Sequence, residues 1–313
     1  MNTPSYMVAI LGTGVWGTAL GKIVQNNDHH VHSWSHRGDI PLGSVVQDAQ
    51  IIVSAVSMQG VVPTAQKLRS LDLPVNKIIV TATKGLDLTT KQTPSLIWQS
   101  ILPHNPVVVL SGPNLSKEID RGLPAATVLA SHNLPAAQQV QQVFASDTFR
   151  VYVNQDPIGT ELGGTLKNVM AIASGVCDGM NLGTNAKAAL LTRALPEMIR
   201  IGKHLGASGA TFFGLSGLGD LIATCDSPLS RNYQVGYRLA QGQTLEKILA
   251  DLEGTAEGVN TTKVLVQIAD LGAIAVPIAQ QVNKLLQSEI TPESAIKSLM
   301  ERNLKSEFDD LDL

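Results

Sequence analysis

The chain has 313 residues, of which 44% are hydrophobic and 16% charged, and its formal net charge is −3. This length exceeds the size at which a single core stops growing and predicts two domains, and the composition is that of a folded protein. The near-neutral charge, without a basic run, excludes the surface expected of a nucleic-acid-binding protein and favours a small-molecule partner.

The first residues run directly into an apolar segment without a charged leader or a cleavage site, so we expect no signal peptide. No uncharged run reaches membrane-spanning length, which predicts no stable membrane insertion. Cys177 and Cys225 lie outside any CxxC pair, which favours a reducing cytoplasm. Three histidines precede or enter the second expected strand without acidic or thiolate partners, so we expect no metal site there: His29, His30 and His32.

Between residues 7 and 153 short β-branched runs alternate with helical patterns, which is typical of a doubly wound parallel sheet. We therefore expect an α/β protein whose N-terminal part, residues 1–156, is a Rossmann-like, dinucleotide-binding domain. The expected strands are 7–12, 31–34, 51–56, 78–83, 107–112, 126–131 and 149–154.

Three glycines follow the first expected strand in a GxGxxG pattern, namely Gly12, Gly14 and Gly17. In this pattern the first glycine permits a tight turn, the second lets the backbone approach a pyrophosphate, and the third lets helix and strand pack closely. The following helix N-terminus also favours an anion. The pattern predicts dinucleotide binding, and the alternative is a glycine-rich turn that binds nothing.

The second expected strand ends in HSWSHRGD, where His36 and Arg37 occupy the usual place of an acidic residue that binds the ribose 2′-hydroxyl of NAD. Because a guanidinium suits a 2′-phosphate, we predict NADP(H) as the favoured cofactor. Asp39 lies slightly later and keeps NAD(H) as the alternative. Arg37 could also be an exposed loop charge.

Polar residues follow two further expected strands, at the edge where open parallel sheets bind ligands. Lys84 directly follows one strand, and Gly112, Asn114 and Ser116 follow the next, just before a helix. An ammonium group, a glycine and a helix start together favour an anion.

Beyond about Asp156 the β-branched runs stop, and we expect an all-helical domain in residues 157–313 that holds the substrate and the catalytic groups. The acidic tail 305–313 is expected to fray. The expected helices are 158–179, 184–206, 208–213, 231–241, 244–252, 259–272, 276–287 and 292–302.

The first of these helices is apolar at Leu162, Leu166, Val169 and Met170, yet it also carries Lys167. Burial lowers the pKa of a lysine, which suits proton transfer near neutrality. The alternative is a side chain that reaches solvent from the edge of the helix.

Asp220 lies in an apolar, glycine-rich stretch, where an unpaired carboxylate is costly, so it needs a cation such as Lys167. Ser230, Arg231 and Asn232 begin a further helix. An arginine at a helix start is unfavourable for the helix dipole but suits a bound anion.

With the glycine fingerprint, TKGL, SGP, GTLKNVMAIASG, SGLGDL and SRN in this order, the chain resembles the NAD(P)-dependent glycerol-3-phosphate dehydrogenases over nearly its full length. The resemblance continues through EGVNTTK (257–263), VPIAQQV (276–282) and LMERNLKSE (299–307). It implies a Rossmann-like domain followed by an all-α domain, and the reversible conversion of dihydroxyacetone phosphate to sn-glycerol 3-phosphate for glycerophospholipid synthesis. It leaves a homodimer open.

The resemblance also implies residue roles. Lys167 is the general acid and base, Asp220 holds and tunes it, and Lys84 orients or polarises the carbonyl. The implied substrate contacts are Lys84, Gly112, Asn114, Lys167, Asp220, Ser230, Arg231 and Asn232. The implied cofactor contacts are Gly12, Gly14, Val15, Trp16, Gly17, His36, Arg37, Lys84, Ser116, Arg231 and Glu257.

Two features depart from the family pattern. The segment between Arg37 and the third strand is shorter than usual, which opens the adenosine end of the cofactor site. Asn114 and Ser116 stand where serine or threonine and alanine are common, and an asparagine can still hydrogen-bond a substrate hydroxyl.

Two other functions compete with this interpretation. A reductase of the same design acting on a β-hydroxy acid would need a carboxylate clamp, whereas the SRN sequence beside Lys84 suits a phosphate ester. A dinucleotide-sensing regulator would need neither Lys167 nor Asp220.

Overall fold

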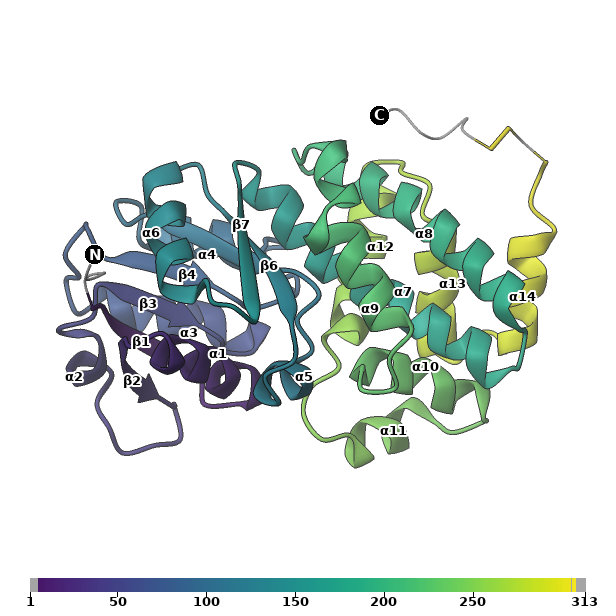
Figure 1. Cartoon of the computed structure of the whole chain (residues 1–313). Helices are drawn as coiled ribbons and strands as arrows, with labels where there is room; N and C mark the ends of the chain where they lie inside the picture. Colours follow the sequence, from purple (N-terminus) through teal and green to yellow (C-terminus); the bar gives the residue numbers. More distant parts are fainter. Residues whose placement is uncertain (1–4, 305, 308–313) are drawn as a thin grey trace. The chain divides into compact units, whose positions relative to one another are not determined.

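The computed structural model describes residues 5–304, 306 and 307, and the chain divides into two compact units (Figure 1). The first unit extends through Asp87 and resumes over Gln92–Glu161, and the second contains Leu88–Lys91 and the chain from Leu162 onward. The expected fraying of the acidic tail falls largely outside the described residues.

The first unit is built on a seven-stranded sheet with the strand order β2-β1-β3-β4-β5-β6-β7. All seven expected strands are present, each within two residues of its expected ends. The strands are β1 (Met7–Leu11), β2 (His30–Trp34), β3 (Ile51–Ser54), β4 (Ile78–Thr81), β5 (Val107–Ser111), β6 (Ala125–Ala130) and β7 (Phe149–Asn154).

The sheet is mostly, but not wholly, parallel, because β6 runs antiparallel to β5 and parallel to β7. The connection from β5 to β6 contains only the five-residue helix α5 (Ser116–Asp120). Such a helix is about 7.5 Å long, whereas a five-residue strand is about 17 Å long, so α5 cannot return the chain to the opposite edge of the sheet. The end of β5 and the start of β6 therefore lie at the same edge.

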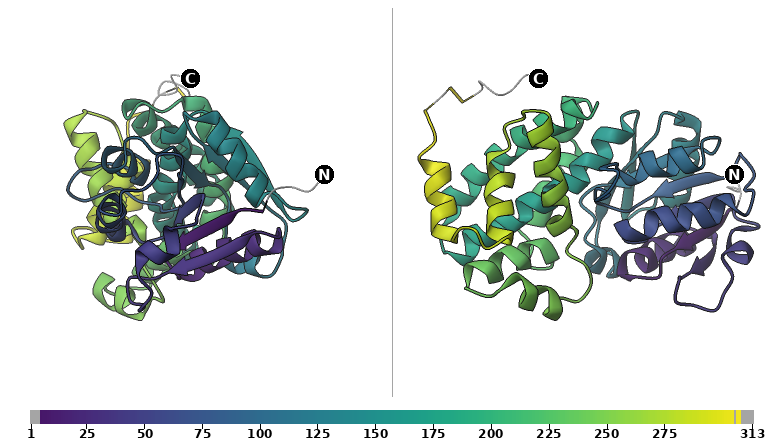
Figure 2. Two further views of the ribbon diagram at one scale, coloured as in Figure 1. Left: turned by 90° about the vertical axis from the view of Figure 1, so that its left-hand side faces the viewer. Right: turned by 180° about the vertical axis from the view of Figure 1, so that it is seen from behind.

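Helices cover both faces of this sheet. Alternate residues of β1 point to opposite sides, so Val8 and Ile10 pack with α1 (Val15–Asn26) and α6 (Leu134–Phe144). The neighbouring residues of β1 pack on the other face, which is in front in the reverse view of Figure 2. The helices on that face are α2 (Leu42–Val46), α3 (Met58–Arg69) and α4 (Pro94–Ile101).

Helices make up the second unit, as the sequence predicts. The sequence did not predict the π-helical turn η2 (Leu215–Gly219) and the helix α9 that follows it, since glycines break the apolar pattern there. The other elements are α7 (Pro157–Gly179), which begins in the first unit, α8 (Thr184–His204), η1 (Gly209–Phe213), α9 (Asp220–Cys225), α10 (Arg231–Ala240), α11 (Leu245–Asp251), α12 (Glu257–Leu271), α13 (Pro277–Leu286) and α14 (Pro292–Met300).

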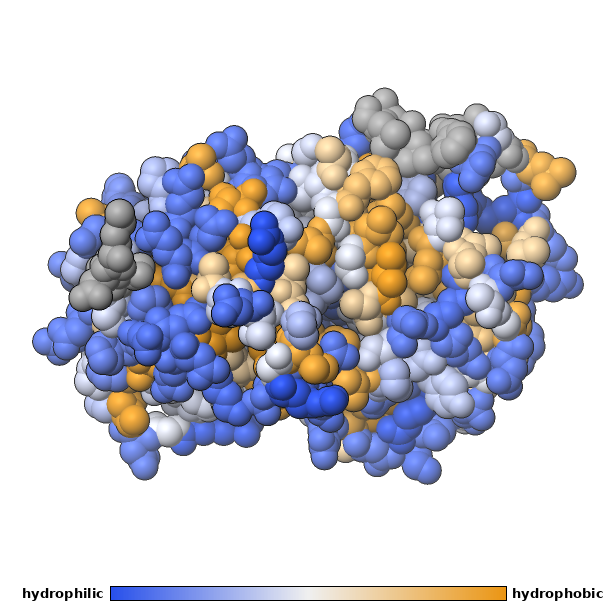
Figure 3. Space-filling view, in the orientation of Figure 1, coloured by the Kyte–Doolittle hydropathy of each residue, from blue (hydrophilic) through white to orange (hydrophobic). Residues whose placement is uncertain are grey.

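Hydrophilic side chains cover much of the face of each unit seen in Figure 3, with apolar patches between them. No helix among the described residues is long and apolar enough to cross a membrane.

In each unit a buried glutamate caps a helix that begins with proline. Glu161 accepts the backbone N–H of Ser95 at 2.9 Å at the start of α4, and Glu197 accepts the N–H of Ala279 at 2.8 Å at the start of α13. In neither helix does the side chain of the N-cap residue accept a hydrogen bond from the first turn. The two glutamate carboxyls therefore bind backbone amides that would otherwise lack acceptors.

Burial raises the pKa of both glutamates to about 7, although their hydrogen bonds oppose the shift. Since the folded pKa lies above the usual value of 4.5, the protonated form favours folding. The resulting stabilisation, on the order of 3 kcal/mol each, is complete below about pH 4.5 and is lost as the pH rises to about 7.

Between pH 5 and pH 7.5 the stability of the wild-type protein should fall as these carboxyls ionise. We expect the double variant Glu161→Gln, Glu197→Gln to show little of this fall. The check is the free energy of unfolding across this range, with Glu289→Gln, at an exposed position, as the control. An unaltered pH profile in the double variant would show that these carboxyls do not titrate in this range.

Candidate functional site

The turn between β1 and α1 has the backbone geometry that the glycine fingerprint requires. Gly12 has a φ of +106°, and a Cβ there would lie 2.7 Å from the carbonyl oxygen of Ala55. A Cβ at Gly17 would lie 1.9 Å from the carbonyl oxygen of Gly12, so only glycine allows the helix to pack this close. Gly14 is the N-cap of α1 and has open space around it, which leaves room for a ligand to approach the first amides of the helix.

The two residues inside this motif differ in their surroundings. Val15 is 64% exposed, at the first position of α1. Trp16 packs partly against the sheet core and donates its indole N–H to the carbonyl of Ala82 at 3.2 Å. Trp16 therefore holds α1 to the end of β4, independently of any ligand contact.

The end of β2 leads to a cluster of exposed polar residues. The hydroxyl of Ser35 accepts the backbone N–H of Arg37 at 3.3 Å, while the side chains of His36, Arg37 and Asp39 face solvent. The shortened segment that follows forms α2 before the chain enters β3.

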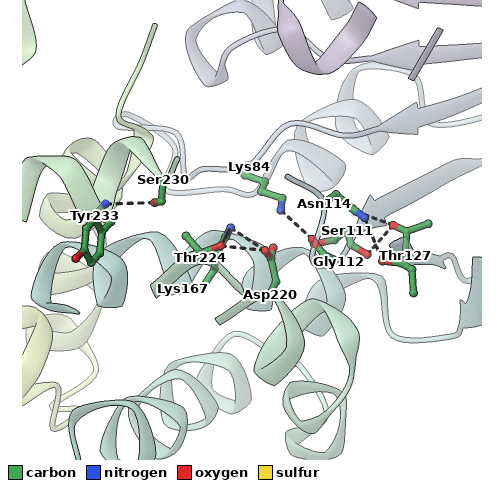
Figure 4. A network of polar contacts seen from close by, with 11 residues as sticks. Lys84, Ser111, Gly112, Asn114, Thr127, Lys167, Asp220, Thr224, Ser230 and Tyr233 are labelled. Atoms are coloured by element: carbon green, nitrogen blue, oxygen red, sulfur yellow. Dashed lines mark hydrogen bonds and ion pairs between the residues drawn. The ribbon is translucent and has the colours of Figure 1, made fainter. Parts of the chain in front are cut away.

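At the β4 and β5 ends, the ammonium of Lys84 lies 3.4 Å from the carbonyl oxygen of Gly112 (Figure 4). The side-chain amide of Asn114 donates to the carbonyl of Ala126 at 3.1 Å, and its oxygen accepts the hydroxyl of Thr127 at 2.9 Å. Asn114 thus fixes the turn from β5 to β6, a role that the sequence did not reveal. Ser116 is the first residue of α5 and is half-buried.

In the second unit, Lys167 of α7 is 6% exposed and lies 2.8 Å from a carboxylate oxygen of Asp220, which is 1% exposed (Figure 4). The lysine therefore does not reach solvent, and the pairing expected from the apolar setting of Asp220 is present. A buried charge without a partner would cost several kcal/mol, roughly 3–5, so each residue requires the other.

Thr224 completes this group and was missed by the sequence analysis. Its hydroxyl accepts a hydrogen bond from Lys167 and lies 3.1 Å from the same oxygen of Asp220. The two residues are four apart on α9, so they share one face of the helix. The signal was the spacing of DLIAT, which becomes informative only once residues 220–225 are known to be helical.

Close backbone packing sets the position of α9. A Cβ at Gly163 of α7 would lie 2.7 Å from the carbonyl oxygen of Ser216, so glycine lets η2 approach α7 directly. The hydroxyl of Ser174, also on α7, donates to the carbonyl of Cys225 at 2.8 Å. Both contacts hold α9 along the helix that carries Lys167.

The start of α10 combines a capped helix with an exposed cation. The hydroxyl of Ser230 accepts the backbone N–H of Tyr233 at 3.2 Å, and Arg231, the first helical residue, is exposed. A Cβ at Gly254 would lie 2.4 Å from a guanidinium nitrogen of Arg231, so the arginine rests against this glycine.

Asn232 is buried and links α10 to α12, because its side-chain oxygen accepts the backbone N–H of Gly258 at 2.9 Å. Glu257, the first residue of α12, is half-buried and accepts the hydroxyl of Thr255 at 3.3 Å.

Each unit therefore gathers part of the predicted residues. The first offers helix amides, a glycine turn and the ammonium of Lys84, all suited to anionic groups. The second offers a buried lysine held by a carboxylate and a hydroxyl, and an exposed arginine at a helix N-terminus. Among the described residues, no group of three histidine, cysteine, aspartate or glutamate side chains could hold a metal ion.

Comparisons with known proteins agree with this arrangement. Residues 156–297 match the family model for the NAD-dependent glycerol-3-phosphate dehydrogenase C-terminus, and residues 7–42 and 40–137 match the model for the N-terminus. The chain is 62% identical over 304 residues to a glycerol-3-phosphate dehydrogenase [NAD(P)+] of Acaryochloris marina, covering 97% of this chain and 98% of the relative.

A second relative of the same name, from Synechocystis sp., is 61% identical over 312 residues, covering 100% of this chain and 98% of the relative. Among solved structures, the glycerol-3-phosphate dehydrogenase of Coxiella burnetii superimposes with a TM-score of 0.91 at 31% identity, covering 95% of this chain and 99% of the other.

The different space around two glycines gives a matched pair of variants. We expect Gly17→Ala to destabilise the protein, because its Cβ would collide with the Gly12 carbonyl, whereas Gly14→Ala should fold normally. Gly14→Ala should nevertheless weaken NADPH binding about tenfold or more, because the methyl group occupies space near the first amides of α1. Thermal unfolding and NADPH titration test both statements, and unchanged affinity in Gly14→Ala would place the pyrophosphate elsewhere.

Proposed function

This chain belongs to the NAD-dependent glycerol-3-phosphate dehydrogenase family, and we propose that it catalyses the reversible reduction of dihydroxyacetone phosphate to sn-glycerol 3-phosphate. NADP(H) is the favoured cofactor and NAD(H) the alternative. The observation that carries the proposal is the buried Lys167–Asp220 pair, because a folded protein without proton chemistry gains little from it. The product is the backbone of glycerophospholipids, which places the reaction in phospholipid biosynthesis.

The glycine turn and the N-terminus of α1 fit the pyrophosphate of the cofactor, whose bound nicotinamide supplies the hydride. Arg37 binds the 2′-phosphate of NADP(H), and its solvent exposure leaves the guanidinium accessible for this contact. The proposed cofactor contacts are Gly12, Gly14, Val15, Trp16, Gly17, His36, Arg37, Lys84, Ser116, Arg231 and Glu257.

Lys167 moves the proton. As an ammonium it donates a proton to the carbonyl oxygen during reduction, and as an amine it accepts the proton of the alcohol in reverse. Asp220 stabilises the charged form, and Thr224 fixes the direction of the Nζ atom by a second hydrogen bond. Lys84 stabilises negative charge that develops on the carbonyl oxygen.

Arg231 binds the phosphate of the substrate together with the N-terminus of α10. A cation at the start of a helix opposes the helix dipole, so its position is favourable only when an anion is bound there. Ser230 and Asn232 hold the helix start through their own hydrogen bonds. The remaining proposed substrate contacts are Lys84, Gly112, Asn114, Lys167 and Asp220.

We further propose that the protein is cytoplasmic. Cys177 and Cys225 are unpaired and buried, as is common in a reducing compartment. We also propose that the protein forms a homodimer, which a measurement of its mass in solution would test.

Lys167→Ala should lower kcat about a thousandfold or more, because the variant removes the proton donor. NADPH should still bind, because the glycine turn is left intact. Arg231→Ala should instead raise the KM for dihydroxyacetone phosphate. Steady-state kinetics, NADPH titration and thermal unfolding distinguish these effects. A Lys167→Ala protein that loses folding together with cofactor binding would make the lysine structural.

The first assay is the loss of 340 nm absorbance of NADPH, or of NADH, on addition of dihydroxyacetone phosphate. We expect oxidation that requires the phosphate group, with unphosphorylated dihydroxyacetone as the control, and a higher kcat/KM for NADPH. Arg37→Ala should lower the NADPH to NADH ratio of kcat/KM about tenfold. Consumption of neither nucleotide, when both bind, would favour the β-hydroxy acid reductase or the sensor, and an unaltered ratio would remove Arg37 from the 2′-phosphate.

A further inference from the structure

The helical unit holds a second cluster of charged side chains, centred on Lys187 of α8. Its ammonium lies 2.7 Å from a carboxylate oxygen of Asp178 and 2.9 Å from one of Asp226, and the lysine side chain is only 16% exposed. Asp178 lies near the end of α7, and Asp226 directly follows α9. One ammonium group therefore joins three helices of the unit.

Tyr233 of α10 belongs to the same cluster. Its hydroxyl donates to the Asp178 oxygen that also binds Lys187, at 2.7 Å, and the Lys187 ammonium lies 5.6 Å from the centre of its ring. The backbone N–H of Tyr233 in turn donates to the hydroxyl of Ser230 (Figure 4). The cluster thus contacts the start of the loop 226–230, at Asp226, and the first turn of the helix that follows it.

Two groups of this cluster, Lys187 and Tyr233, keep their protons at neutral pH. Burial lowers the pKa of Lys187, but the hydrogen bonds to Asp178 and Asp226 outweigh it and hold the pKa above its usual value. Burial and the Asp178 carboxylate raise the pKa of Tyr233 to about 12, so its hydroxyl remains a donor.

The loop 226–230 leads directly into Arg231. Within it, the backbone N–H of Ser230 donates to the carbonyl of Ser227 at 3.0 Å, and that of Leu229 donates to the hydroxyl of Ser227 at 3.2 Å. The side-chain amide of Gln234 also donates to the carbonyl of Pro228 at 2.7 Å and ties the loop to α10. The contacts at Asp226 and Tyr233 join the loop and the start of α10 to α8 and α7. The Lys167–Asp220 pair has separate supports in α7, the packing of Gly163 and the hydrogen bond of Ser174.

We propose that Lys187, together with Asp178, Asp226 and Tyr233, is a positioning cluster that sets the affinity for the substrate phosphate by fixing the loop 226–230 and the start of α10. It acts through Ser230 and Arg231. This inference rests on the proposed function, because it requires the phosphate to bind at Arg231.

The test variant is Lys187→Met, which removes the ammonium and keeps most of the side-chain stem. We expect the KM for dihydroxyacetone phosphate to rise about tenfold, with kcat within about twofold and the KM for NADPH unchanged, because the phosphate site shifts while Lys167 and Asp220 stay in place. The inhibition constant of inorganic phosphate, as a competitor of the substrate, should rise by a similar factor. Lys187→Arg should restore both values.

Arg238→Gln is the matched control. It breaks an ion pair of 2.6 Å between Arg238 and Asp251 near the other end of α10, and it should leave the KM unchanged. If Lys187→Met fails to fold, Tyr233→Phe removes only the bond to Asp178 and should raise the KM by a smaller factor.

A fall in kcat at constant KM, or an equal effect of Arg238→Gln, would overturn the positioning role. An active wild-type enzyme whose Lys187→Met and Tyr233→Phe variants keep the parental KM would also overturn it and leave the proposed function standing. A wild-type protein that oxidises neither NADPH nor NADH with dihydroxyacetone phosphate, although both bind, would refute the proposed function itself.

Discussion

The helical unit depends on the burial of one ion pair. Lys167 and Asp220 are nearly inaccessible to solvent, and the free energy lost by removing two charges from water must be recovered by their attraction and hydrogen bonds. That recovery requires accurate distances, which explains why α7 and α9 are tied by backbone contacts rather than by side chains alone. Gly163 brings η2 against α7, and Ser174 holds the end of α9.

The same helix, α9, connects this pair to the proposed phosphate site. Asp220 and Thr224 lie on it, and the loop 226–230 that follows it leads to Arg231. The side chain of Arg231 is exposed to solvent, whereas Lys167 is buried. Arg231 is thus suited to bind a charged ligand, and Lys167 is suited to transfer a proton in a site that bulk water does not reach.

Helix N-termini recur throughout the molecule as sites that attract negative charge. At α4 and α13 the partner is a buried glutamate of the chain itself, and burial brings the pKa of each carboxyl to about 7. At α1 and α10, the two helices to which the proposal assigns the cofactor and the substrate phosphate, the first turn carries no acidic residue, as is also the case at α3 and α8. The N-termini of α1 and α10 are therefore suited to an external anion.

The sequence by itself determined the strands, most helices and the order of the motifs, because period-two and helical patterns and the requirement for glycine in tight turns are local properties. It also indicated the pairing of Lys167 with Asp220, since a carboxylate in apolar surroundings needs a cation. Only the tertiary structure decided that β6 is antiparallel to β5, that residues 220–225 form a helix carrying Thr224, and that Asn114 and Asn232 bond to distant backbone. Those features depend on contacts between separate segments, 12 residues apart for Asn114 and Ala126 and 26 for Asn232 and Gly258, which local patterns do not encode.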